Sequence, residues 1–328
     1  MWNPLSNVRG SDCGEGSLSP RRTALIMEKV EYRGWPNCVR LANAEIELIV
    51  TTEVGPRVIR CGFIGDENEF GEYPDQLGKV GGDQWRIYGG HRLWHAPEVI
   101  PRTYALDNGP VQATMDSEVL RLVQPIEPET GVQKEMDIRL DDNANHVTVV
   151  HRLRNGNAWT VELSPWAVSV MNTGGVCIVP LAPYVSHDDK VQPSQPLILW
   201  AYTDLTDPRL VCSKKYIRLR QDPRATAPIK LGLLNVQGWA AYARNGHLFV
   251  IQHPTDPTKQ YPDFNASLET FTNADMLEIE TLAPLTAVAP GGVVGHVEEW
   301  WLHRNVNLGD ASDEAIDLAV ARVIPHGH

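Results

Sequence analysis

The sequence has no cluster of basic residues and no apolar run long enough to span a bilayer. Its 328 residues include 29 lysines and arginines against 41 aspartates and glutamates, which gives a formal net charge of -12 at pH 7. Such an acidic chain repels the phosphates of nucleic acids and of anionic lipids. A membrane-spanning helix would need about 20 consecutive apolar residues. We therefore expect neither nucleic acid nor a membrane as a partner.

Cysteine is scarce and shows no pairing pattern. The cysteines are odd in number and none stands in a Cys-x-x-Cys motif, which argues against a disulfide framework and a cysteine zinc site. Residues 1–24 lack the apolar segment of a secretory signal and are rich in Gly, Ser, Pro and Arg. We expect them to form a disordered leader. Reduced thiols and the missing signal together predict a cytoplasmic protein. The five cysteines are Cys13, Cys38, Cys61, Cys177 and Cys212.

Helical periodicity is nearly absent before residue 312. Short segments with alternating apolar and polar residues recur instead, separated by turn sequences such as Asn245-Gly246, a pattern typical of antiparallel strands. The exception is Ser312–Val323, where an apolar stripe follows a capping serine. We predict an all-β fold of antiparallel sheets with a short C-terminal helix, forming a single domain over residues 25–328.

The segment Met276–Arg304 carries the most specific functional signal. Its first part alternates so that Glu278 and Glu280 share one face of a strand, opposite Leu277 and Ile279. On an ordinary exposed strand both glutamates would be solvated surface residues. Here a Pro-Gly turn and an aromatic-rich strand follow. This order resembles the C-terminal signature of the galactose mutarotase (aldose 1-epimerase) superfamily.

The resemblance extends to the start of the chain. Within residues 43–63, a Glu-Leu-Ile-Val strand leads into Val-Gly-Pro-Arg-Val-Ile, which is similar to the first hairpin of the superfamily. The resemblance implies a β-supersandwich of antiparallel sheets with a sugar groove on its concave face. It also implies that Glu280, which precedes Thr281, is the general base that takes the proton from the anomeric hydroxyl.

Residues 88–98, Tyr-Gly-Gly-His-Arg-Leu-Trp-His-Ala-Pro-Glu, place several polar groups close together. Two glycines permit positive φ or a close approach to a ligand, and similar Gly-Gly loops line the sugar groove in the superfamily. We therefore expect this loop to contact the sugar. The residues concerned are His91, Arg92, Trp94, His95 and Glu98.

Two other interpretations of the same segment remain open. His91 and His95 have the i, i+4 spacing of a helical metal pair, but the flanking Gly and Pro disfavour a helix and no further ligands are evident. We expect no metal and no cofactor. Alternatively, Arg92 pairs with Glu98 and the histidines only satisfy backbone carbonyls.

The general acid is not where the resemblance would place it. Aldose epimerases carry it as a histidine in a His-x-Tyr-Phe type strand near mid-chain, whereas residues 161–171 contain Trp166 and no histidine. The acid is then expected from His91, His95 or His253. Indole rings stack on the apolar face of a pyranose, so Trp239 joins Trp94 as a candidate sugar contact. Glu278 and His253 complete the predicted set.

The resemblance implies an aldose 1-epimerase-like isomerase that acts on a small sugar or sugar phosphate. Glu280 would serve as base and a histidine as acid, with His91 and Arg92 in the same pocket. A non-catalytic carbohydrate-binding or sensing protein on the same fold is the main alternative, because a fold does not determine a function. A polysaccharide-processing enzyme is a third candidate, against which the chain length and the missing secretion signal argue.

Overall fold

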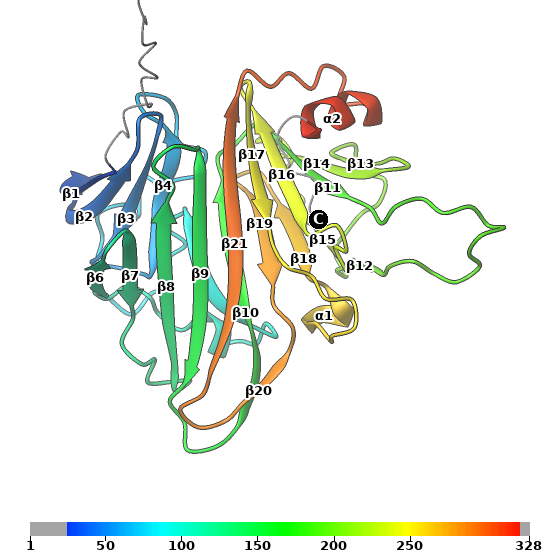
Figure 1. The fold of residues 1–328 in the computed structure, drawn as a ribbon. Helices are drawn as coiled ribbons and strands as arrows, with labels where there is room; N and C mark the ends of the chain where they lie inside the picture. Colours follow the sequence, from blue (N-terminus) through cyan, green and yellow to red (C-terminus); the bar gives the residue numbers. More distant parts are fainter. Residues whose placement is uncertain (1–24, 322–328) are drawn as a thin grey trace, which may run out of the picture.

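The computed structural model describes residues 25–321, which form two large antiparallel β-sheets (Figure 1). One sheet has eleven strands and the other has ten. The all-β prediction is confirmed. The predicted leader, residues 1–24, lies outside the described residues, as do residues 322–328.

The first sheet contains the strands that matter for function. In spatial order it consists of β1 (Ile26–Tyr32), β2 (Trp35–Ala42), β3 (Ile46–Thr51), β4 (Arg57–Phe63), β5 (His91–Ala96), β10 (Val161–Met171), β19 (Leu277–Leu282), β18 (Leu268–Thr272), β15 (Ile229–Leu233) and β12 (Leu197–Leu199), with β20 (Thr286–Val288) paired to β10.

The second sheet packs against the first. In spatial order it consists of β13 (Leu210–Cys212), β14 (Tyr216–Arg220), β11 (Val176–Pro180), β16 (Trp239–Arg244), β17 (His247–Gln252), β21 (Val293–Arg304), β9 (His146–Asn155), β8 (Val132–Leu140), β7 (Val119–Val123) and β6 (Gln112–Asp116). The described residues also form a 3-10 turn, η1 (Arg102–Tyr104), and two helices, α1 (Pro262–Asn265) and α2 (Asp313–Val320).

The main hydrophobic core fills the space between the two sheets. Leu93 and Ile279 enter it from the first sheet, and Val149 and Trp300 enter it from the second. Successive side chains of a strand point to opposite faces, so every second residue faces this core. The positions between them lie on the other face of each sheet.

Five neighbouring strands in the middle of the first sheet position the candidate site. The register sets Arg92 of β5 beside Val168 of β10, and Val168 beside Glu280 of β19. Glu280 in turn lies beside Glu269 of β18. Directly paired residues share a face of the sheet. Because Ile279 lies in the core between the sheets, Glu280 and its partners lie on the face turned away from the second sheet.

Residues 91–96 form strand β5, not the loop expected from the sequence. The glycines before it serve the backbone. Gly89 and Gly90 have φ of 100° and 71°, and a Cβ on them would lie 2.0 Å from the carbonyl oxygen of Gly71 and 2.3 Å from that of Val58. Positive φ and contact with neighbouring backbone both require glycine. The Gly-Gly pair therefore lets the chain pass close to neighbouring backbone where it enters the sheet.

The C-terminal helix is where the sequence predicts it. Helix α2 covers Asp313–Val320, and the Ser312 side chain accepts a hydrogen bond from the backbone N–H of Ala315. Ile316 is fully buried and packs in a satellite cluster against the second sheet. This confirms the predicted serine cap and, with Val320 packed against the same cluster, the described part of the apolar stripe. Val323, the last residue of the predicted stripe, lies outside the described residues.

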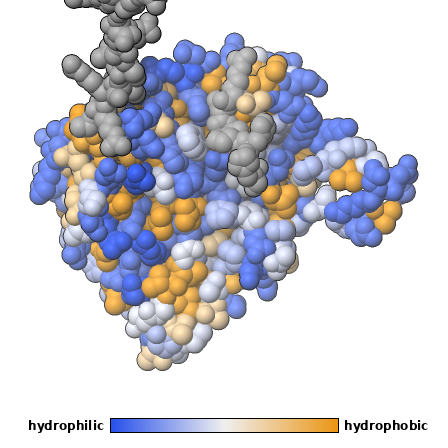
Figure 2. Space-filling model, in the orientation of Figure 1, coloured by the Kyte–Doolittle hydropathy of each residue, from blue (hydrophilic) through white to orange (hydrophobic). Residues whose placement is uncertain are grey.

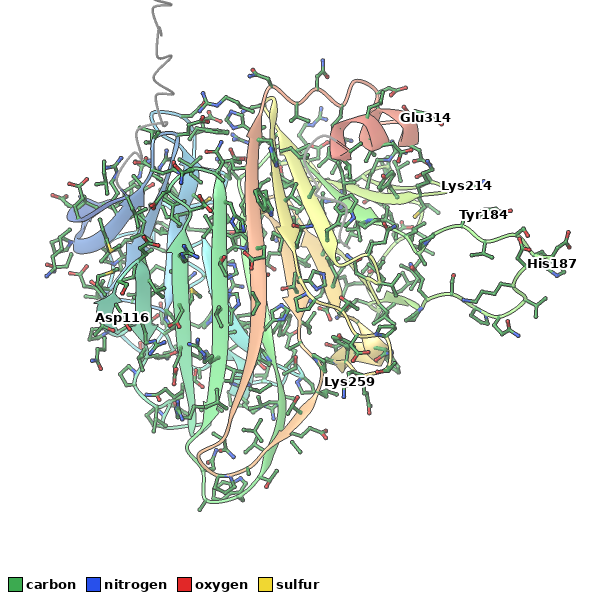
Figure 3. All side chains as sticks on the ribbon, viewed as in Figure 1. Asp116, Tyr184, His187, Lys214, Lys259 and Glu314 are labelled. Carbon is green, nitrogen blue, oxygen red and sulfur yellow. The ribbon has the colours of Figure 1, made fainter. Side chains whose placement is uncertain are left out.

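A long loop, residues 181–196, extends beyond the sheets on the side of β12 (Figure 1). Figure 3 places His187 at the tip of this loop, and Tyr184 at its base lies under Lys214, whose Nζ is 3.9 Å from the ring centre. The surface in this view is mostly hydrophilic, with apolar residues in separate patches (Figure 2).

Within residues 25–321, no helix combines the length and apolar character needed to cross a membrane. The cysteines in this part of the chain carry free thiols, as predicted. Three of them are buried and the fourth, Cys212, is exposed.

Candidate active site

A cavity of about 340 Å³ opens on the face of the first sheet that is turned away from the second sheet. Strands β5, β10, β19, β18 and β15 contribute to its lining, together with segments next to the strands. Its lining combines charged side chains with aromatic rings. The charged residues are Arg92, Glu98, Lys230, Asp275, Glu278 and Glu280, and the aromatic residues are Tyr73, Trp85, Trp94, Tyr104, Trp166, Tyr202 and Phe271.

A larger cavity of about 650 Å³ lies between the end of β21 and α2. His303 and Arg304 are among its lining residues, but no aspartate or glutamate is. It therefore offers no carboxylate for general base chemistry. The smaller cavity over the first sheet is the candidate active site.

Glu280 is held by two donors at the bottom of the candidate site. Its Oε2 accepts hydrogen bonds from Lys230 Nζ at 2.9 Å and from Trp166 Nε1 at 3.0 Å. Lys230 Nζ also lies 2.8 Å from Oε2 of Glu269. The second oxygen of Glu280, Oε1, has no hydrogen-bond partner among the described residues. One oxygen is thus anchored, and the other keeps its lone pairs for another group.

Burial and charge act against each other in this cluster. Burial raises the pKa of Glu280 above its ordinary value, and the attraction of Lys230 only partly offsets this. Burial also raises the pKa of Glu269 well above its ordinary value, and the attraction of Lys230 again offsets only part of this rise. Burial also lowers the pKa of Lys230, but its two carboxylate neighbours outweigh burial and the net shift is well upward. Lys230 is therefore a stable ammonium between two carboxyl groups of elevated pKa.

A second ion pair and a group of aromatic rings form the opposite part of the site. Arg92 Nη2 donates to Oε1 of Glu278 at 3.0 Å, and the Arg92 guanidinium lies 4.5 Å from the ring centre of Trp94. Trp94 in turn packs edge-on against Trp166 and Tyr104, at centroid separations of 5.3 and 5.1 Å. These contacts fix the ring surfaces before any ligand arrives.

Glu98 lies at the exposed rim of the site and accepts a hydrogen bond from the Tyr104 hydroxyl at 2.5 Å. The pKa of Tyr104 is raised, mainly because its ring is buried and also because its hydroxyl donates to Glu98. The interpretation in which Arg92 pairs with Glu98 is therefore wrong, because Glu278 is the partner of Arg92.

Five of the residues singled out from the sequence meet in this cavity, and they are Arg92, Trp94, Glu98, Glu278 and Glu280. The predicted histidines do not join them. His91 and His95 are 0% and 1% exposed and share the face of β5 that carries Leu93, so they point into the core between the sheets. His91 contacts Ser169 and His151 there. The prediction that His91 shares a pocket with Glu280 is wrong, because consecutive residues of a strand face opposite ways.

His253 and Trp239 also lie elsewhere. His253 follows β17 of the second sheet and is buried, with its ring 6.1 Å from that of His296. Trp239 begins β16 and packs on Tyr216 at a centroid separation of 6.1 Å, in the cluster beneath α2. Neither residue lines the candidate site.

The structure adds residues that the sequence pattern did not identify as site residues. In the sequence, Lys230 is a single charged residue next to the apolar run 231–234, and Trp166 is the side chain that replaces an expected histidine. Both contact Glu280. Tyr104 and Tyr202 carry no sequence signal at all. A lone lysine inside a buried strand was the one available clue, since such a lysine requires a buried carboxylate partner.

Comparison of the sequence with protein-family profiles gives no match, and comparison with curated proteins gives none either. The fold, by contrast, is similar to many solved structures. A galactose mutarotase-like protein from Lactobacillus casei has a TM-score of 0.54 at 10% sequence identity, covering 81% of this chain and 100% of that one.

Two further solved structures give the same result. A candidate aldose 1-epimerase from Klebsiella pneumoniae has a TM-score of 0.55 at 12% identity, covering 93% of this chain and 88% of that one. A candidate mutarotase from Salmonella typhimurium has a TM-score of 0.51 at 10% identity, covering 85% and 97%. At such low identity the likeness concerns the fold alone. The chain has the fold of galactose mutarotase-like and aldose 1-epimerase proteins.

Proposed function

We propose that the chain binds an aldose in the candidate active site and interconverts its anomers, with Glu280 as the general base. The observation that carries this proposal is the asymmetric setting of the Glu280 carboxylate. Oε2 is anchored by Lys230 and Trp166, while Oε1 has no partner among the described residues. A base needs both a fixed position and a free lone pair.

Anomer interconversion requires one proton to leave the sugar and one to arrive. The base removes the proton of the C1 hydroxyl, and the ring oxygen receives a proton as the bond between C1 and the ring oxygen breaks. The open-chain aldehyde rotates about its C1–C2 bond, and the ring closes on the other face of C1. A base with a pKa shifted toward neutrality suits both directions, and burial shifts the pKa of Glu280 upward.

The lining also supports a substrate class. The site contains four carboxylates but only two cations, Arg92 and Lys230, and each cation already contacts a carboxylate. A phosphate group would meet net negative charge, whereas neutral hydroxyls can use both donors and acceptors. The aromatic wall at Trp94 offers a surface for the apolar face of a pyranose. An unphosphorylated aldose fits best.

A second function, sugar binding without catalysis, is favoured by one specific observation. Among residues 25–321, no histidine lines the candidate site. In the catalytic proposal the proton for the ring oxygen therefore comes from another donor of the lining. The hydroxyl and ammonium groups available are those of Tyr73, Tyr104, Tyr202 and Lys230. If none of them can deliver it, the site binds a sugar without interconverting its anomers.

Polarimetry or NMR exchange on a panel of free aldoses tests the proposal. Wild type should accelerate anomer interconversion, and Glu280→Gln should slow it by about 10²–10⁴-fold while sugar affinity stays within a few-fold. The amide keeps the shape of the side chain but cannot take the proton. Glu118→Gln is the matched control, because Glu118 is an exposed glutamate that pairs with Arg139 on the second sheet. Sugar binding without acceleration would support the second function.

A further inference from the structure

Three ionisable side chains converge in the core between the two sheets, away from the candidate active site. They are His91 of β5, His151 of β9 and Glu298 of β21, and each is 0% exposed. Ligand atoms from all three lie within 4.8 Å of one another. Such positions normally hold apolar residues, because burying a charged or polar group without compensation is costly. A group of three at one point of the core calls for a specific partner.

The geometry of the three groups is convergent. His91 Nε2 lies 2.7 Å from His151 Nε2 and 3.8 Å from Oε2 of Glu298. Both imidazoles thus present the same ring nitrogen to one point, and the carboxylate closes the third side. Two nitrogens bound to one tetrahedral zinc, at about 2.0–2.1 Å each, lie about 3.3 Å apart. A separation of the two rings by roughly half an ångström would therefore accommodate the ion.

The remaining atoms of the three side chains are already oriented by neighbours. His91 Nδ1 lies 2.9 Å from Ser169 Oγ, and His151 Nδ1 lies 3.3 Å from the carbonyl oxygen of His296. A carbonyl oxygen can only accept, so His151 carries its proton on Nδ1 and presents a bare Nε2.

Glu298 is held in the same manner. Its Oε2 accepts from Trp300 Nε1 at 2.8 Å and its Oε1 accepts from the Thr281 hydroxyl. Outer contacts of this kind fix the tautomer and direction of metal ligands in proteins. They leave the inward-facing lone pairs of the three groups directed at one another.

We propose that His91, His151 and Glu298 form a buried site for a divalent transition-metal ion, with Zn²⁺ the best match. Two imidazoles and a carboxylate are a donor set that zinc accepts. The ion would join both sheets through three strands. The ion would also hold β5 in place through His91. The residue that follows His91, Arg92, lines the candidate active site. His95 is not part of the site, because its Nε2 lies 3.6 Å from Glu127 instead.

Metal analysis of the untagged full-length protein tests this inference, which is independent of the proposed function. Elemental analysis should find close to one zinc per chain. Refolding from denaturant with Co²⁺ in place of zinc should give a visible absorption band of protein-bound Co²⁺. His151→Leu and Glu298→Gln should each lower the metal content at least tenfold. His187→Gln should leave it unchanged, since His187 is exposed at the tip of the 181–196 loop.

Metal content and Co²⁺ absorption of the wild-type protein are enough to contradict the proposal. Wild type that contains less than a tenth of a metal ion per chain, and that gives no visible band after refolding with Co²⁺, would overturn the proposal. The three side chains would then form only a hydrogen-bonded core cluster, in which His91 Nε2–H donates to His151. Because this outcome is measured on wild type, misfolding of a core variant cannot obscure it.

Discussion

Lys230 Nζ lies 2.9 Å from Glu280 and 2.8 Å from Glu269, so one buried ammonium is shared by two buried carboxyl groups from adjacent strands. The Trp166 and Trp200 rings cover it, each with its centre 4.8 Å from Nζ. The arrangement keeps two like charges side by side in a site of low polarity. Lys230 therefore controls both the stability of the first sheet and the pKa of the proposed base.

Lys230→Met should raise the pKa of Glu280 further, because the variant removes the positive charge that holds the pKa down. The limb of the activity profile that rises with pH should move to higher pH. The free energy of unfolding at pH 7 should fall by about 3–5 kcal/mol, because two buried carboxyl groups lose their partner. A pH–rate profile and urea denaturation measure the two effects.

A double variant provides the control for this prediction. Lys230→Met combined with Glu269→Gln removes one carboxylate along with the ammonium, so it should recover part of the lost stability. Residues in one network give such non-additive effects, typically of about 0.5–3 kcal/mol. Strict additivity of the two single changes would show that Lys230 and Glu269 are not energetically coupled.

The sequence predicts the sandwich well because alternation and turn residues are local signals. It fails at β5 for a physical reason. All six residues of His91–Ala96 are buried, so polarity does not distinguish the core face from the site face. A shift of one residue exchanges His91 and Arg92 between the two faces. The partners of Lys230 depend on the pairing of β15, β18 and β19, which is a long-range property. Glu280 could be found because its strand alternates.

His95→Gln tests the assignment of faces on β5. Because His95 points into the core beside Glu127, its replacement should leave the rate of anomer interconversion within about twofold, while stability falls by about 0.5–3 kcal/mol. Polarimetry and thermal unfolding give the two values. If the rate dropped a hundredfold in a folded variant, His95 would have to reach the candidate site, and the arrangement described for β5 would be incorrect.

Glu127→Gln should lower the free energy of unfolding by an amount that depends on pH. Glu127 lies 2.6 Å from Lys134 Nζ in the core. Burial raises the pKa of Glu127, but the charges of Lys134 and His95 outweigh it and lower that pKa from 4.5 to about 2. Because the pKa of Glu127 is lower in the folded state than in the unfolded state, the ionised carboxylate stabilises the folded protein at pH values above 4.5. This stabilisation is lost as the pH falls from about 4.5 to about 2.

The variant should therefore lose on the order of 3 kcal/mol at pH 7, and the difference from wild type should shrink progressively below pH 4.5. Urea denaturation at several pH values measures this. Glu118→Gln, at an exposed ion pair, should change stability by less than about 0.5 kcal/mol at any pH. A difference for Glu127→Gln that does not vary with pH would point to packing and not to charge.

The charge of the candidate site predicts its preference between free and phosphorylated sugars. Four carboxylates face two cations there, and both cations are already paired. A 6-phosphate should therefore bind at least about tenfold more weakly than the parent aldose, which corresponds to about 1.4 kcal/mol. Calorimetric titration with both sugars measures the ratio. Asp275→Asn removes one exposed carboxylate at the rim and leaves Glu280 unchanged. In this variant the affinity of the 6-phosphate should come closer to that of the free aldose. If the sugar phosphate bound more tightly than the free aldose, its phosphate group would instead be placed at Arg92, whose Nε and Nη1 have no partners among the described residues.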